Sequence, residues 1–271
     1  MKEDQPDRKA LLKRVQSRRD FPLWTLPITI VMTILAWETF TRFSGLPSFI
    51  FPSPQAVWSR FLSAVADGSL LWHTRVTLLE VLGGLALGLV TATCLGYGLA
   101  KSRTIERILA PYIVASQSVP VVAIAPLLVI WFGPGKLSKL LISALIVFFP
   151  ILINTIIGVR SVPEDLRDLM RSLRASRWQM FTKLEVPAAM PVLFGGLKIG
   201  ATLSVIGAVV GEFVGADEGL GFLINVGRGV YDTAFVFVVV FDLIGMALTL
   251  YAMVAGLERR LLAWREIPSQ S

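Results

Sequence analysis

The 271-residue sequence is poor in the residue types on which most metal and redox sites depend. It contains one cysteine, Cys94, and one histidine, His73. A single cysteine excludes a disulfide framework and any CxxC zinc or redox site within the chain. A single histidine likewise excludes a histidine-cluster metal centre. Because no GxxxxGK[ST] motif is present, the chain has no phosphate-binding loop for hydrolysing a nucleotide by itself. We therefore expect no metal, no cofactor and no enzymatic activity in this chain.

Charged residues are also scarce, at 17% of the sequence, against about 25% in an ordinary soluble domain. Hydrophobic residues reach 54%, above the usual level of about 45–50%. They gather in long runs, and about 20 apolar residues in a helix cross a hydrocarbon layer of ~30 Å. The sequence therefore predicts an all-α membrane protein with six transmembrane helices. Their expected ranges are about 24–43, 76–99, 108–132, 140–158, 192–214 and 234–257.

The basic residues give the sequence a net charge of +7. Nineteen of the 26 lysines and arginines fall in residues 1–22, 100–107, 159–191 and 258–271. Since lysine and arginine mark cytoplasmic segments, both termini are predicted to be cytoplasmic. We expect a basic leader at 1–22, with the first run retained as a signal anchor, a transmembrane domain at 23–258 and a tail at 259–271. This distribution explains the charge without a nucleic-acid partner.

The longest predicted cytoplasmic loop, residues 160–191, has the pattern of folded helices. Pro163 stands directly before Glu164 and Asp165, as at a helix start. Four apolar residues follow at helical spacing, with charges between them: Leu166, Leu169, Met170 and Leu173. A second short helix is predicted at 176–184, with prolines at 187 and 191 ending the loop. Such an apolar edge fits a groove on a cytoplasmic partner, and a solvated amphipathic connector is the alternative.

The segment DLMRSLRASRWQMFTKLEVPAAMP, residues 168–191, resembles the EAA loop of permease subunits of binding-protein-dependent ABC importers. The resemblance places Asp168 at the acidic position of the motif and Pro187 at the exit proline. Arg174 stands where the family has a glycine, which permits a left-handed turn between two helices. An arginine adopts that conformation at a cost of about 1 kcal/mol or more, so the turn geometry stays open at this point.

Other segments resemble one branch of these permeases, which serves sulfonates, taurine, nitrate, thiamine-precursor pyrimidines and riboflavin. They are residues 51–58, 118–133, 148–162 and 206–224. The resemblance implies a cytoplasmic dimer of ABC ATPase subunits, an extracytoplasmic solute-binding protein, a second permease copy forming a homodimer, and the cell inner membrane with its lipids. The loop residues expected to couple to the ATPase are Asp165, Asp168, Leu169, Met170, Arg171, Leu173, Arg174, Ala175 and Pro187.

Candidate pathway residues are polar, aromatic or helix-breaking groups within the apolar runs: Gln117, Ser118, Pro120, Trp131, Asn154 and Glu212. Ionisable groups inside a membrane are costly and usually face an interior. A structural role is the alternative for Glu212, which can be wet or paired with Asp242 or Lys198. The prolines at 111, 120, 126 and 150 are expected to break the third and fourth spans. We interpret His73 as a surface residue and Cys94 as a buried apolar one.

Glycines recur four residues apart, at 84 and 88, 196 and 200, and 207 and 211. Such pairs let helices approach closely, and internal packing is preferred to a dimer seam. Riboflavin or a thiamine-precursor pyrimidine is the expected substrate, with an alkanesulfonate, taurine or nitrate as alternatives. An ion-driven secondary transporter is the alternative from another class, although it would normally show more spans or an internal repeat. A membrane-embedded enzyme would need a nucleophile–base pair or a metal constellation.

Overall fold

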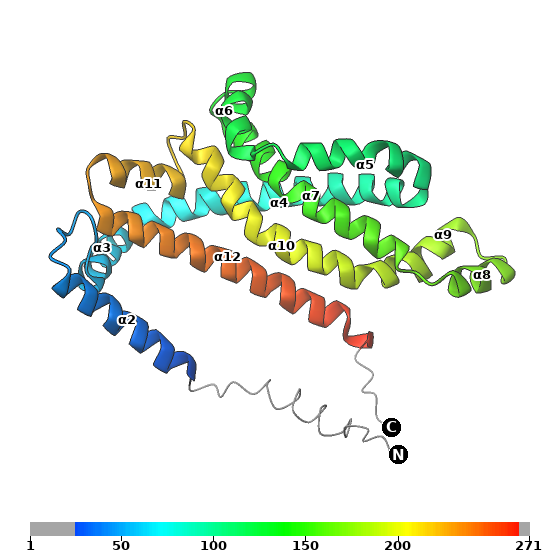
Figure 1. Ribbon diagram of the computed structural model, residues 1–271, viewed down its shortest axis with the longest axis horizontal. Coiled ribbons are helices and arrows are strands. Elements are labelled where there is room, and N and C mark those ends of the chain that lie inside the picture. Colours follow the sequence, from blue (N-terminus) through cyan, green and yellow to red (C-terminus); the bar gives the residue numbers. More distant parts are fainter. Residues whose placement is uncertain (1–24, 266–271) are drawn as a thin grey trace, which may run out of the picture.

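A computed structural model describes residues 25–265, and every regular element in that range is a helix (Figure 1). The predicted leader and the last six residues of the predicted tail lie outside the described residues. The helices are α2 (Thr25–Phe43), α3 (Pro54–Ala66), α4 (Ser69–Lys101), α5 (Arg103–Gln117), α6 (Val121–Phe132), α7 (Lys136–Arg160), α8 (Glu164–Ser172), α9 (Arg177–Met180), η1 (Phe181–Glu185), α10 (Val186–Phe213), α11 (Leu220–Gly229), α12 (Thr233–Leu261) and η2 (Ala263–Arg265).

Four helical stretches in the described range are long and apolar enough to cross a membrane: α4, α7, the continuous stretch from α9 to α10, and α12. Helices α5 and α6 are apolar enough to form a fifth span if the two are counted together. The chain turns by 91° between them. The third predicted span is therefore bent, and the bend falls at Pro120, which disfavours helix at the residue before it. Helix α2 carries Glu38 and Arg42 near its end. The count of six spans stays a prediction.

The core of the bundle is helix α7, which lies between α4 and α10 and makes its most extensive contacts with them (Figure 1). Glycines allow this approach. A Cβ atom added at Gly207 of α10 would lie 2.5 Å from the Cα atom of Ser143 in α7, and one at Gly84 of α4 would lie 2.3 Å from the Ser143 hydroxyl oxygen. That hydroxyl donates a hydrogen bond to the Ser204 carbonyl at 3.1 Å. The predicted glycine pairs therefore serve packing within the chain.

Pro150 lies inside α7, which runs without interruption from residue 136 to 160. The expected break at this proline is wrong, since α4 and α10 enclose the helix on both sides and hold it in place. The expected breaks at Pro111 and Pro126 are also wrong, because these prolines lie inside α5 and α6. Prolines are tolerated in membrane helices when neighbouring groups satisfy the freed backbone atoms. In α7 the proline leaves the Ile146 carbonyl without its usual amide donor, and one turn further on the side-chain amide of Asn154 donates to the Pro150 carbonyl at 2.7 Å.

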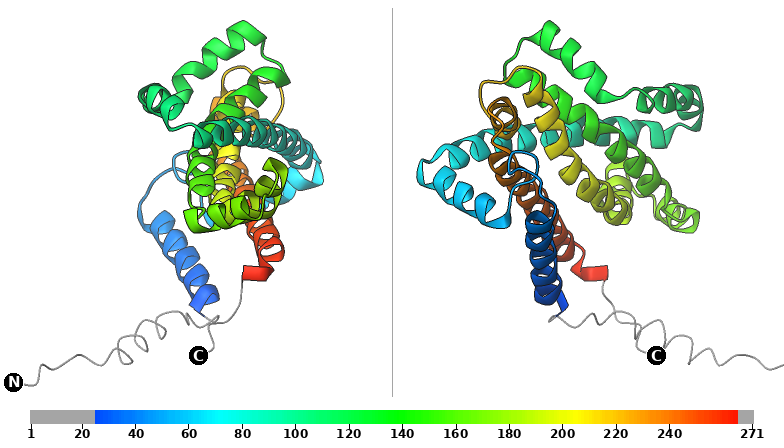
Figure 2. Two further views of the ribbon diagram at one scale, coloured as in Figure 1. Left: turned by 90° about the vertical axis from the view of Figure 1, so that its right-hand side faces the viewer. Right: turned by 60° about the vertical axis from the view of Figure 1, so that its left-hand side comes forward.

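Helix α3 follows the first predicted span and buries Val57 and Ala64. Ser53 caps it by accepting a hydrogen bond from the Ala56 amide. Arg60 ties it to the start of α12, because its Nε atom lies 2.7 Å from a carboxylate oxygen of Asp232 and its guanidinium covers the Phe235 ring at 4.3 Å. Helix α2 stands apart from the bundle at its Thr25 end (Figure 2).

Candidate coupling loop and pathway residues

Helix α8 occupies the range that the sequence predicts. It begins directly after Pro163, with Glu164 and Asp165 in the first turn, where acidic side chains favour the helix dipole. Its large apolar residues are exposed: Leu166 by 44%, Leu169 by 54% and Leu173 by 69%. An exposed apolar edge beside polar residues marks an interaction site, so α8 presents a surface that nothing else in the described chain covers.

The turn after α8 has the left-handed geometry that the motif requires, even though an arginine occupies the glycine position. Arg174 has a φ angle of +52°. Its amide donates to the Arg171 carbonyl, and the Ala175 amide donates to the Met170 carbonyl, both at 2.9 Å. These two bonds are the Schellman pattern that ends a helix. The turn therefore forms with arginine at this position, at the conformational cost of a left-handed non-glycine residue.

The segment after the turn differs from the prediction. Ser176 and Gln179 form a capping box that starts α9, as at an independent helix. The chain then passes through the π-helical turn η1 directly into α10, so that residues 177–213 form one 37-residue stretch. The predicted helix start at Ser176 is confirmed, but its predicted end at residue 184 is wrong. Pro187 does not end this stretch, because the chain passes from the π-helical turn η1 through Pro187 into α10 without leaving the helix.

The charged residues of the loop make few strong bonds. Asp168 accepts from Arg171 at 2.9 Å, but both side chains are about 70% exposed. Exposed ion pairs of this kind contribute between zero and about 1 kcal/mol. Asp165 is also exposed. The predicted coupling residues before α10 therefore lie together on one accessible helix–turn–helix.

The six candidate pathway residues do not come together in one place. Gln117, Ser118 and Pro120 are exposed at the bend between α5 and α6, and Trp131 is exposed at the other end of α6. Asn154 is half-buried in α7, where its side chain faces Gly196 of α10. Glu212 is fully buried near the end of α10.

Glu212 anchors the start of α11 to two transmembrane helices. Its carboxylate accepts hydrogen bonds from the Thr77 hydroxyl of α4 at 2.6 Å and from the Gly221 amide at 2.5 Å. The Thr77 oxygen in turn accepts from the Leu220 amide at 2.8 Å. The free amides at the start of a helix bind negative groups. Glu212 therefore acts as a structural anchor among α4, α10 and α11 in the single chain.

Next to this anchor, Glu80 of α4 and Lys139 of α7 form a buried ion pair with an Nζ–Oε1 distance of 2.9 Å. Their side chains are 2% and 7% exposed. The predictions from the sequence include neither this pair nor Thr77. The available signal was Glu80 itself, because an acid in an apolar run requires a partner. We name Thr77, Glu80, Lys139 and Glu212 the buried polar cluster.

The suggested partners of Glu212 are wrong. Lys198 pairs with Glu258 of α12 at 2.8 Å, and Asp242 accepts a hydrogen bond from Thr74 at 2.5 Å. His73 is half-buried and accepts a hydrogen bond from the Gly219 amide at 2.9 Å. The interpretation of His73 as a surface residue is therefore correct only in part, since the loop before α11 contacts it through this bond.

Apolar helices of membrane-crossing length, tightly packed through glycines and joined to an exposed helix–turn–helix, define a multi-pass membrane protein. Residues 84–263 match the family described as the inner membrane component of binding-protein-dependent transport systems, and the chain belongs to this family. It is the permease subunit of an ABC importer.

Its relatives cover nearly its whole length. The riboflavin transport system permease protein RibX of Chloroflexus aurantiacus is 47% identical, over 93% of this chain and 94% of RibX. The formylaminopyrimidine transport permease protein ThiX of Halalkalibacterium halodurans is 34% identical, over 92% of this chain and 99% of ThiX. The taurine transport system permease protein TauC of Escherichia coli is 29% identical, over 87% of this chain and 88% of TauC.

A crystal structure of an amino acid ABC transporter supports the fold. It superposes with a TM-score of 0.58 at 18% identity, over 74% of this chain and 98% of that chain. At this level of identity the likeness concerns the fold alone.

Proposed function

We propose that the chain forms the membrane pathway of an ATP-driven importer for riboflavin or a related vitamin precursor such as a thiamine pyrimidine. The observation that carries this proposal is the 47% identity to RibX across nearly the whole chain. The lower identity to TauC supports an alkanesulfonate, taurine or nitrate less well. Uptake without any ATPase would instead indicate an ion-driven secondary transporter.

The energy for transport would come from a separate pair of ABC ATPase subunits on the cytoplasmic side, where α8 would dock. Docking would remove Leu169 and Leu173 from water, and fully burying such a side chain contributes about 1.5–3 kcal/mol. Closure of the ATPase dimer would then move the loop and shift the bundle between inward-facing and outward-facing states.

Two copies of the chain, each with six spans and both termini in the cytoplasm of the inner membrane, would enclose the pathway. A solute-binding protein would deliver the substrate on the external side, near α3 and α11. Gln117, Ser118, Pro120 and Trp131 are exposed in the single chain, so a second copy can bring them to a shared interface. Asn154 would line the pathway from α7, and Glu212 would shape it by fixing the position of α11.

The decisive test is uptake into cells or proteoliposomes that contain the chain with its ATPase and binding protein. The substrates are labelled riboflavin, the thiamine pyrimidine, taurine and an alkanesulfonate. We expect ATP-dependent uptake of riboflavin or the pyrimidine. Uptake of a sulfonate alone would contradict the vitamin assignment, and uptake without the ATPase would contradict the importer mechanism.

The coupling role is tested by the variant Leu169→Asp. A charge at this exposed position should lower ATP-dependent uptake at least tenfold, because it prevents burial in the ATPase groove. The matched control is Ser172→Asp, which adds the same charge to another side of α8. The amount of inserted protein is measured in parallel. Equal uptake in both variants would contradict docking through the leucine edge.

A further inference from the structure

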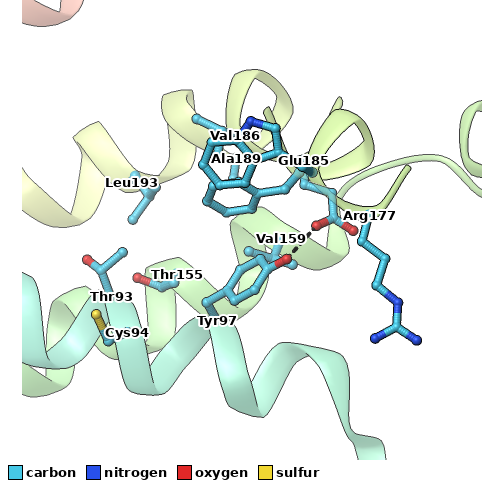
Figure 3. A pocket seen from close by; sticks show the side chains of 12 residues that line it. Thr93, Cys94, Tyr97, Thr155, Val159, Arg177, Glu185, Val186, Ala189 and Leu193 are labelled. Carbon is cyan, nitrogen blue, oxygen red and sulfur yellow. Dashed lines mark hydrogen bonds between the residues drawn. The ribbon is translucent and has the colours of Figure 1, made fainter. Parts of the chain in front are cut away.

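Two cavities adjoin at the end of the bundle near α8. The first has a volume of about 720 Å³ and lies between α4, α7 and the stretch from α9 to α10 (Figure 3). Its lining is mostly apolar or aromatic and includes Thr93, Cys94, Val159, Phe181 and Leu193. Cys94 is exposed in this cavity, which corrects its interpretation as a buried residue. We name this space the apolar cavity.

The second cavity, of about 680 Å³, lies between α8 and the end of α4 and is cationic. It is lined by four basic residues, Lys101, Arg167, Arg171 and Arg177, and by one acid, Glu185. The acid is already engaged, since its carboxylate accepts from the Tyr97 hydroxyl at 2.9 Å and pairs with Lys101. We name this space the basic cavity, and its positive charge exceeds what its own acid neutralises.

The arginines of the basic cavity retain free hydrogen-bond donors. Arg167 donates from one terminal nitrogen to the Val159 carbonyl at 2.8 Å. Its Nε atom is buried and has no hydrogen-bond partner. Arg171 faces one competing acid, Asp168, at 2.9 Å. Because the Nε atom of Arg167 is closed off from solvent, an anion in the cavity would meet the terminal nitrogens of Arg167 and the exposed guanidinium groups of Arg171 and Arg177.

The two cavities are parts of one site, because Tyr97, Arg177 and Glu185 line both. Figure 3 shows the Tyr97 hydroxyl and the Glu185 carboxylate facing each other, with the guanidinium of Arg177 extending away from the apolar side chains. A ligand that fills both cavities must therefore be an amphiphile with an anionic head.

We propose that this site binds one anionic phospholipid, with its phosphate in the basic cavity and an acyl chain in the apolar cavity. Arginine forks match phosphate oxygens geometrically. Basic pockets between membrane helices on the cytoplasmic side suit anionic lipid head groups. A zwitterionic head group fits less well, since its own cation would meet four basic side chains. The chemistry does not depend on which solute the permease transports.

The lipid site does not compete with the leucine edge of α8. Arg167 and Arg171 are four residues apart and share one side of the helix. Leu166, Leu169 and Leu173 follow a different stripe, so α8 can contact a lipid on one side and a protein on another. A bound lipid would fasten α8 to the end of α4.

The first test measures lipid retained by the purified full chain in native mass spectrometry, after exchange into phosphatidylglycerol or phosphatidylcholine with identical acyl chains. We expect about one retained phosphatidylglycerol per chain and at least fivefold less phosphatidylcholine. The double variant Arg167→Gln/Arg177→Gln should lose this preference. The matched control, Arg259→Gln/Arg260→Gln, removes the same charge from the exposed end of α12 and should retain it. Equal retention of both lipids, or equal loss in both variants, would overturn the proposal.

The second test uses Cys94, the one cysteine of the chain, and requires no variant. Its alkylation by N-ethylmaleimide should be at least threefold slower in bilayers containing phosphatidylglycerol than in phosphatidylcholine alone. Millimolar inorganic phosphate in phosphatidylcholine should give no such protection. Equal alkylation rates in the two bilayers, or protection by phosphate alone, would overturn the assignment to a lipid.

Discussion

The buried polar cluster and the coupling loop differ in which side chains they bury. The cluster buries charged side chains, and the loop exposes apolar ones. In the cluster, Glu80, Lys139 and Glu212 lie out of contact with water and find their partners within the chain. In the loop, leucines face outward and the pair of Asp168 and Arg171 is exposed. The cluster forms its ion pair and most of its hydrogen bonds within one chain, with only the second carboxylate oxygen of Glu80 lacking a partner, whereas the loop lacks the surface that would cover its leucines. Substitutions in the cluster should therefore change stability, and substitutions in the loop should change transport.

The largest expected effect is that of Glu80→Ala, which leaves the Lys139 ammonium buried without its partner. Breaking a buried ion pair in this way lowers the free energy of unfolding by about 3–5 kcal/mol. The double variant Glu80→Leu/Lys139→Met should recover most of this loss. Thermal unfolding in detergent measures both, with Glu38→Ala as control because its pair with Arg42 is exposed. Similar losses in the single and the double variant would contradict the importance of the pair.

A smaller loss is expected from Gly207→Ala, because the new Cβ atom would overlap the backbone of Ser143. Helices α7 and α10 would have to separate, and such overpacking costs about 1–3 kcal/mol. Gly98→Ala is the control, since a Cβ atom there meets nothing within 4 Å, and it should leave the unfolding midpoint unchanged or raise it. Equal midpoints in the two variants would refute close packing at Ser143.

In the loop, Arg174→Gly should stabilise the turn by about 1 kcal/mol, because glycine adopts a positive φ angle without steric cost. Hydrogen exchange of the Ala175 amide, which bonds to the Met170 carbonyl, should become slower. Arg174→Val is the opposing control and should accelerate that exchange. Faster exchange in the glycine variant would show that the arginine side chain stabilises the turn.

The smallest change in stability is expected from Leu173→Ser, since the side chain is already exposed. The free energy of unfolding should stay within about 0.5 kcal/mol, while ATP-dependent uptake falls severalfold. Leu152→Ser, at a buried position of α7, should do the reverse and destabilise strongly. A large loss of stability in Leu173→Ser would show that the loop is packed more tightly than the exposed fraction of that residue indicates.

Local signals in the sequence were sufficient for α8. Pro163, the acidic first turn and the spacing of the leucines predict its start and its exposed edge, and the structure confirms both. These signals act within one or two helical turns, so they do not depend on the rest of the fold. The Schellman turn at Arg174 could not be predicted from the sequence, because arginine rarely adopts a positive φ angle.

Contacts between helices could not be predicted in this way. Lys198 and Glu212 lie on one helix, 14 residues apart in number, which separates them by about 21 Å along its axis. Lys198 instead reaches Glu258 on α12, the last residue of the predicted transmembrane domain. The exposure of Cys94 likewise depends on which neighbours leave that face of α4 uncovered.

The unbroken stretch from Arg177 to Phe213 has a mechanical consequence. At 1.5 Å per residue, its 37 residues make a lever about 55 Å long. Near its middle, Gly196 and Gly200 rest closely on α7, which makes this contact a natural pivot. A tilt of about 5° about that point displaces each end by about 2 Å in opposite directions. A displacement of the turn at Arg174 would therefore move the other end of the stretch, where Glu212 binds α11, in the opposite direction.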